Sequence, residues 1–120
     1  YSKEHDLDTI RITWMESENC PEFDTKILFE KDMGVVFIAE DFKYFSLESE
    51  EYVKQMLIMV NDLTGDDIIL SWYCNSYEDQ NMQVFVRYAL VGDKSRTNAE
   101  YYEILNYLVE AVQEKFERIP

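Results

Sequence analysis

The chain has 120 residues, of which 25 are Asp or Glu and 11 are Lys or Arg, so its formal charge is −14 at pH 7. The hydrophobic content of 47% excludes a disordered acidic tail, because such segments lack the apolar residues needed to offset chain entropy. The length indicates one domain over residues 1–120, large enough to bury a core without metal or disulfide staples. The charge disfavours direct binding to nucleic acid or to an anionic membrane, since both need cationic contacts to phosphate.

The first half of the chain predicts three strands and a helix. Residues 1–8 are expected to form a loose N-terminal segment, followed by strands at residues 9–15, 25–31 and 34–45. The last of these should be central, because both alternating sets of residues are apolar between Val35 and Ala39. A turn at residues 32–34 should join it to the preceding strand as an antiparallel hairpin.

Residues 46–63 switch to the three-and-four spacing of a helix, which we expect Ser46 or Ser49 to cap and Gly65 to end. The predicted buried stripe of this helix is Val53, Met56, Leu57, Val60 and Leu63.

The second half predicts strands at residues 68–74 and 82–91, joined by a polar loop at 75–81. Thr97 and Glu100 then fit a capping box at the start of a last helix. Its predicted buried stripe is Tyr101, Ile104, Leu105, Leu108, Val112 and Phe116. The order β-ββ-α-ββ-α predicts an α+β fold, a two-layer sandwich in which a five-stranded, mainly antiparallel sheet carries two amphipathic helices on one face.

The acidic residues gather in particular loops. If every connection reverses the chain direction, the loops alternate between two ends, and one end collects residues 16–24, 46–51 and 75–81, which contain no Lys or Arg. We therefore predict a partner-binding surface there. Its carboxylates would be Glu16, Glu18, Glu22, Asp24, Glu78 and Asp79, and its aromatic anchors Tyr77 and Phe23.

Simpler explanations exist for each part of this surface. Acids at the start of the helix near residue 50 also complement the helix dipole, and acids in turns are often only solvated. A crossover connection would scatter the three loops. Acidity can also serve solubility alone.

The residue types argue against an enzyme. The single histidine, His5, lies in the expected loose segment, so a histidine-based acid–base pair on the core is not available. Asp62–Asp67 lacks the alternating oxygen ligands and terminal Glu of a calcium-binding loop, and the three glycines form no phosphate loop. We predict no catalytic residue, no metal and no cofactor.

The favoured hypothesis is a non-enzymatic protein that occludes a basic protein surface. In general character the chain is similar to bacterial immunity proteins that neutralise nuclease toxins, and a DNA mimic that displays carboxylates in place of phosphates is a variant of this hypothesis. The sequence predicts a cytoplasmic protein, because it contains no apolar run long enough to cross a membrane and no signal-peptide h-region.

Two other classes of function stay open. One is a small-ligand-binding or enzymatic domain with a pocket between sheet and helices, for which Thr13, Ser71 and Arg87 are the polar candidates. The other is a homodimeric module that pairs through an apolar outer sheet face. Cys20 and Cys74 are predicted to be free thiols, with a single bridge between them as the alternative.

Overall fold

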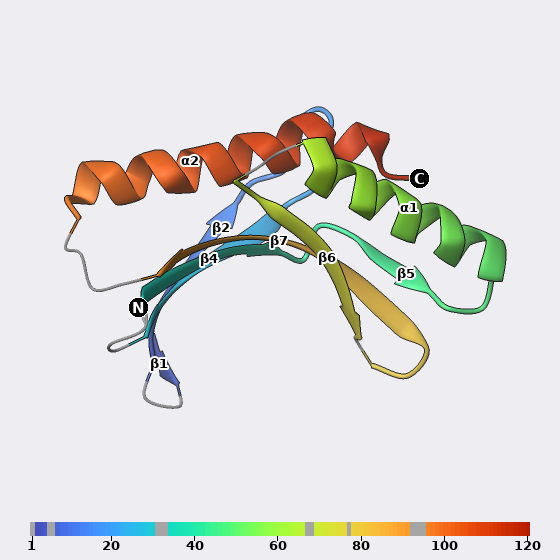
Figure 1. The fold of residues 1–120 in the computed structure, drawn as a ribbon, viewed down its shortest axis with the longest axis horizontal. Helices are drawn as coiled ribbons and strands as arrows, with labels where there is room; N and C mark the ends of the chain where they lie inside the picture. The colour runs from blue at the N-terminus through green and yellow to red at the C-terminus, as the bar shows by residue number, and fades with distance from the viewer. Residues whose placement is uncertain (1, 5–6, 31–33, 67–68, 77, 92–95) are drawn as a thin grey trace.

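The computed structural model describes residues 2–4, 7–30, 34–66, 69–76, 78–91 and 96–120. These residues form one curved sheet with both helices on the same side of it (Figure 1). The elements in chain order are β1 (Ser2–Glu4), β2 (Leu7–Trp14), β3 (Phe23–Glu30), β4 (Gly34–Glu40), β5 (Tyr44–Ser46), α1 (Glu50–Asp66), β6 (Ser71–Ser76), β7 (Asn81–Val91), α2 (Asn98–Lys115) and the 3₁₀ turn η1 (Phe116–Arg118).

The strand order places β4 inside the sheet. The order is β1-β2-β3-β4-β7-β5, with β6 on the other side of β7, and each of these pairings is antiparallel. The predicted α+β fold is confirmed, as are the central position of β4 and its antiparallel pairing with β3. Residues 32 and 33 of the predicted turn lie outside the described part of the chain, and its last residue, Gly34, begins β4 with a positive φ of 132°.

Strand alternation separates a helix-facing side from an outer side. In β3 the odd-numbered residues Phe23, Thr25 and Ile27 are buried, and the even-numbered residues between them are less so. The register continues this pattern into β4, where Ile27 lies opposite Phe37. Because successive side chains point to opposite faces of a strand, the odd-numbered set of β3 and β4 forms the core under the helices.

The two helices cover different parts of the sheet. The Tyr101 ring of α2 packs against Phe29 and Phe37, with ring centroids 5.9 Å and 6.2 Å away. Helix α1 covers the part near β5 and β6, where Tyr52 packs edge-on against Phe45 at 6.2 Å. Between them lies a continuous core whose fully buried residues include Phe37, Met56, Leu63, Val84, Val86 and Leu108.

The described residues form seven strands, where the sequence predicted five. The prediction of a loose segment at residues 1–8 is wrong for the described part, because β1 pairs with β2 and β2 already begins at Leu7. His5 lies outside the described residues. Residues 2–4 are all polar and too few to show the alternation of apolar and polar residues that predicts a strand.

The predicted strand at residues 34–45 is divided at Asp41. This residue has a positive φ of 67°, which ends β4 at Glu40, and the chain pairs again with β7 only at Tyr44. The Asp41 N–H donates to the side-chain oxygen of Gln83 at 2.7 Å, so the bend is held by β7. Asp tolerates this left-handed conformation better than most residues, and alternation in the sequence does not reveal it.

Helix α1 is displaced along the chain relative to its prediction. It begins after Ser49, whose hydroxyl accepts from the Tyr52 N–H at 3.2 Å, whereas Ser46 belongs to β5. It continues through Gly65 to Asp66, so the prediction that Gly65 ends the helix is wrong. Leu57, predicted to be buried, is 48% exposed. For α2, the predicted capping box between Thr97 and Glu100 is confirmed.

Strand β6 starts later than predicted, at Ser71, and a side chain of α1 protects its outer edge. The Thr64 hydroxyl donates to the Trp72 carbonyl oxygen at 3.0 Å and accepts from the Trp72 N–H at 2.9 Å. The Ser76 N–H donates to the side-chain oxygen of the neighbouring Asn75 at 2.9 Å. Exposed strand edges are templates for aggregation, and these two contacts occupy backbone groups that another strand would use.

We expect Thr64→Val to lower the free energy of unfolding by about 1–3 kcal/mol, because it removes both hydrogen bonds and leaves two backbone groups of Trp72 unpaired. Denaturant unfolding followed by circular dichroism measures this change. Thr13→Val is the matched control. It removes one hydroxyl that bonds Asp24 on the exposed side of β2, and should cost less than about 1 kcal/mol. Equal costs for the two variants would contradict the role given to Thr64.

Candidate functional site: an acidic hollow at the C-terminal turn

The loop between β2 and β3 folds back on itself. Ser17 N–H donates to the Cys20 carbonyl oxygen at 2.8 Å, and Cys20 N–H donates to the Ser17 oxygen at 3.4 Å. Cys20 is 4% exposed and belongs to the core, so it anchors the loop while Glu18 and Asn19 remain exposed. Burial raises the pKa of the Cys20 thiol, which keeps it protonated and unreactive at neutral pH.

The C-terminal turn faces this loop and is held in place by α1. The Tyr52 hydroxyl donates to the backbone oxygen of Pro120 at 2.6 Å. The Arg118 guanidinium donates to the Asp66 carboxylate at 3.1 Å. Within the turn, Ile119 N–H donates to the Phe116 oxygen at 3.0 Å. Contacts from both halves of α1 therefore fix the turn against the rest of the domain.

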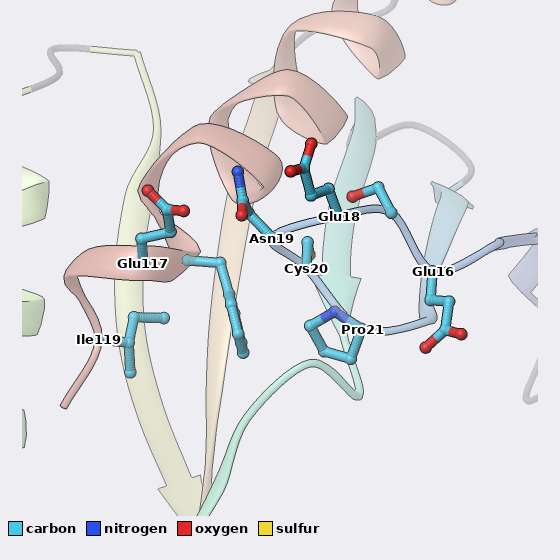
Figure 2. Close-up of a pocket in the computed structure, with 9 residues that line it drawn as sticks. Glu16, Glu18, Asn19, Cys20, Pro21, Glu117 and Ile119 are labelled. Carbon is cyan, nitrogen blue, oxygen red and sulfur yellow. The ribbon is translucent and has the colours of Figure 1, made fainter.

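The loop and the turn enclose an open hollow of about 670 Å³, which we call the acidic hollow. Figure 2 shows Glu117 and Ile119 on the turn, across from Glu18, Asn19 and Pro21 on the loop. The complete lining is Glu16, Ser17, Glu18, Asn19, Cys20, Pro21, Phe116, Glu117 and Ile119.

The chemistry of the acidic hollow suits a cation. Its lining contains three carboxylates and no Lys or Arg, and Pro21, Phe116 and Ile119 supply apolar surface beside them. An aliphatic stem with a charged end, such as a Lys or Arg side chain, can use both kinds of contact. Within the described residues, no three His, Cys, Asp or Glu side chains are grouped so as to hold a metal ion.

The predicted site residues fall into separate groups. Glu16 and Glu18 line the acidic hollow, and Glu22 is exposed on the same loop. Glu78 and Asp79 are exposed at the tip of the β6–β7 hairpin, which pairs instead with the segment before α1, where Leu47 N–H donates to the Gln80 oxygen at 2.8 Å. In Figure 1 the β2–β3 loop lies at the top, beside the C-terminal end of α2, whereas that hairpin tip lies at the lower right, apart from it.

One of the two predicted aromatic anchors is not available to a partner. Phe23 is 1% exposed and packs edge-on against Phe42 at 6.2 Å, so the prediction of a surface anchor there is wrong. Phe23 is the first residue of β3 and belongs to the helix-facing set. The sequence prediction assigned residues 16–24 to a loop and therefore missed this burial. Tyr77 lies outside the described residues.

Asp24 belongs to an ion network on the outer sheet face. Its carboxylate accepts from the Thr13 hydroxyl at 2.7 Å and lies 3.9 Å from Arg11. Glu40, 8% exposed, is paired with Arg11 at 3.1 Å and Lys26 at 3.2 Å. The charge of Asp24 is thus partly compensated within the chain, so its attraction for a cationic partner is weaker.

Glu117 is the functional candidate that the sequence prediction missed. It is about a hundred residues from Glu18 in the chain, and only tertiary packing brings it to the same hollow. The sequence did contain one indication of this packing. Phe116 and Ile119 are apolar and follow the end of the buried stripe of α2, and both pack against the core.

The alternative hypothesis of a small-ligand site placed its pocket between the sheet and the helices, where the structure has a groove beside α2. The groove lined by Ile69, Tyr88, Glu103, Ile104 and Tyr107 has a volume of about 150 Å³. Ligand pockets are usually about 300–1,000 Å³, so this groove is too small for an ordinary substrate. Of the polar candidates for an inner site, Arg87 is exposed on the outer face, 5.6 Å from the Tyr73 ring.

Comparison with known proteins shows the fold and no family. No family model and no curated protein matches the chain. The chain is similar to the crystal structure of YbjN, "a putative transcription regulator from E. coli", with a TM-score of 0.62 and 10% sequence identity. The match covers 90% of this chain and 74% of that one. None of the helices in the described ranges has the length and apolarity to cross a lipid bilayer.

Asp41, at the bend between β4 and β5, makes stability depend on pH. Burial raises the pKa of its carboxyl group, with Asp24 and Glu40 adding to the effect, while the hydrogen bond from the Tyr44 hydroxyl opposes it. A carboxyl group with a raised pKa in the folded state binds its proton more tightly there than in the unfolded chain. The folded state therefore loses stability as the pH rises through that pKa.

We expect Asp41→Asn to be more stable, relative to wild type, at pH 7 than at pH 4. Asn keeps a side-chain oxygen for the Tyr44 hydroxyl and tolerates positive φ, so the variant removes the charge and little else. Free energies of unfolding from denaturant titrations at the two pH values measure the difference. Asp79→Asn, at the exposed hairpin tip, is the matched control for loss of one carboxylate. The prediction is contradicted if the stability of Asp41→Asn relative to wild type is the same at pH 4 and pH 7, or is greater at pH 4.

Proposed function

We propose that this chain is a non-enzymatic binding protein that uses the acidic hollow to receive Lys or Arg side chains from a basic protein surface. The observation that carries the proposal is that Glu16, Glu18 and Glu117 line one hollow together with apolar side chains, with no base in the lining. The carboxylates would pair with the cationic groups, and the apolar lining residues Pro21, Phe116 and Ile119 would contact the aliphatic stems.

The total charge supports a basic partner. A formal charge of −14 on a chain of this size accelerates encounter with cationic proteins and repels anionic ones. The YbjN description concerns transcription regulation, and for this chain the charge disfavours direct contact with DNA phosphates. A regulatory role would therefore act through a protein. The more specific form of the proposal is an immunity or inhibitor protein that covers the cationic groove of a nuclease toxin in the cytoplasm.

The proposal predicts that reversing the three carboxylates of the hollow weakens binding at least about tenfold, because each exposed charge pair contributes about 0.2–1 kcal/mol and the reversed charges add repulsion. The variant is Glu16→Lys, Glu18→Lys, Glu117→Lys. Calorimetric titration with a lysine-rich peptide gives the affinity, and recovery of basic proteins from extracts of the native host, at low and high salt, tests the natural partner.

The matched control changes net charge by the same amount at the other acidic site. Glu48, Glu78 and Asp79 are exposed near the β6–β7 hairpin, so Glu48→Lys, Glu78→Lys, Asp79→Lys should retain most of the binding. Equal losses in both variants would show that total charge alone attracts the peptide. Absence of binding by wild type would also reject the proposal.

A further inference from the structure

The outward side of α1 carries apolar side chains that no described part of the chain covers. Leu47, just before the helix, is 42% exposed, Leu57 is 48% exposed and Ile58 is 53% exposed. They border a shallow groove of about 420 Å³, lined by Leu47, Glu50, Val53, Lys54, Leu57 and Ile58. Single exposed apolar residues are ordinary, so the grouping of these side chains along one groove makes this face a candidate interaction surface.

The order of residues along this groove is self-complementary. Read from Leu47 to Leu57, it is apolar, acidic, apolar, basic, apolar, and it is nearly symmetric about residues 52–53. When a second copy lies antiparallel, Leu47 of each copy meets Leu57 of the other, and Glu50 meets Lys54 twice. A two-fold contact needs this property, because the same patch must fit itself.

We propose that this face of α1 pairs with the same face of a second copy of the chain, with the two helices antiparallel. The proposal does not depend on the acidic hollow, which lies at the C-terminal turn.

Charge favours a second copy at this face in particular. Two chains that each carry −14 repel one another, so copies can associate only where the surface is locally balanced. Glu50 and Lys54 supply that balance beside the groove. At 3.6 residues per turn, the nearby acids Glu51 and Asp62 are turned about 120° to 140° away from Leu57 around the helix axis, and they lie beyond Ile58 at the rim of the groove.

The size of the surface determines the expected strength. The contact consists of about one helix face, which is smaller than the roughly 1,600 Å² buried in a stable interface. We therefore expect a reversible dimer whose population rises with concentration. Sedimentation equilibrium from micromolar to millimolar concentration measures its dissociation constant.

Leu57→Asp should raise that dissociation constant at least tenfold, because it places a carboxylate against Leu47 of the other copy at both ends of the apolar contact. Tyr102→Asp is the matched control, since Tyr102 is 61% exposed on α2, away from the groove. Circular dichroism verifies that both variants fold. A dimer that persists in Leu57→Asp, or a wild type that is monomeric over the whole range, would overturn the proposal.

A charge exchange tests the pairing of Glu50 with Lys54 and leaves the apolar residues in place. Glu50→Lys alone and Lys54→Glu alone should each weaken self-association, and the double variant should restore it. An equimolar mixture of the two single variants should form a heterodimer more readily than either associates with itself. Glu51→Lys, in the same helical turn on another side, controls for effects of charge on the helix.

The outer sheet face is the competing surface between copies. Ala89→Glu places a charge on that face, where Ala89 lies exposed opposite Val36. If this variant abolishes the dimer while Leu57→Asp and the charge exchange do not, the sheet face is the interface and the proposal for α1 is wrong.

Discussion

The arrangement of this protein depends on burying one side of a single antiparallel sheet under two helices. Phe37, on the central strand, is completely buried and lies within ring-contact distance of Tyr88 on β7 and Tyr101 on α2. Because strand residues alternate between faces, this burial also determines which side chains of every neighbouring strand are left on the outer face. The ion network and the Tyr73–Phe85 stack, with ring centroids 5.1 Å apart, lie on that outer face as a result.

The negative charge is unevenly compensated over the fold. Arg11 and Lys26 are paired with Glu40 on the sheet, and Arg118 is paired with Asp66 at the end of α1. The carboxylates of Glu16, Glu18 and Glu117 have no such cationic partner among the described contacts and share one hollow. The charge of these three carboxylates is therefore left for a cationic partner to neutralise.

Helix α1 links the two surfaces that we propose for interaction. Its inner side anchors the domain through Met56 and Leu63, and Tyr52 fixes the C-terminal turn that forms one wall of the hollow. Its outer side carries the exposed apolar groove with Leu57. A surface helix that only packs on the core has a polar outer face. Burial of the core therefore does not explain the apolar residues on the outer side of α1.

The sequence by itself determined the fold class, the antiparallel hairpin of β3 and β4, and the capping box of α2, because alternation, helical spacing and capping are local properties. Only the tertiary structure decided that Phe23 is buried, that Leu57 is exposed and that Asp41 divides a strand. Each of these depends on which neighbour covers a residue, and a local pattern does not contain that information. The acidic hollow has the same origin: Glu18 could be identified in its loop, but Glu117 joins it only because α1 holds the C-terminal turn in place.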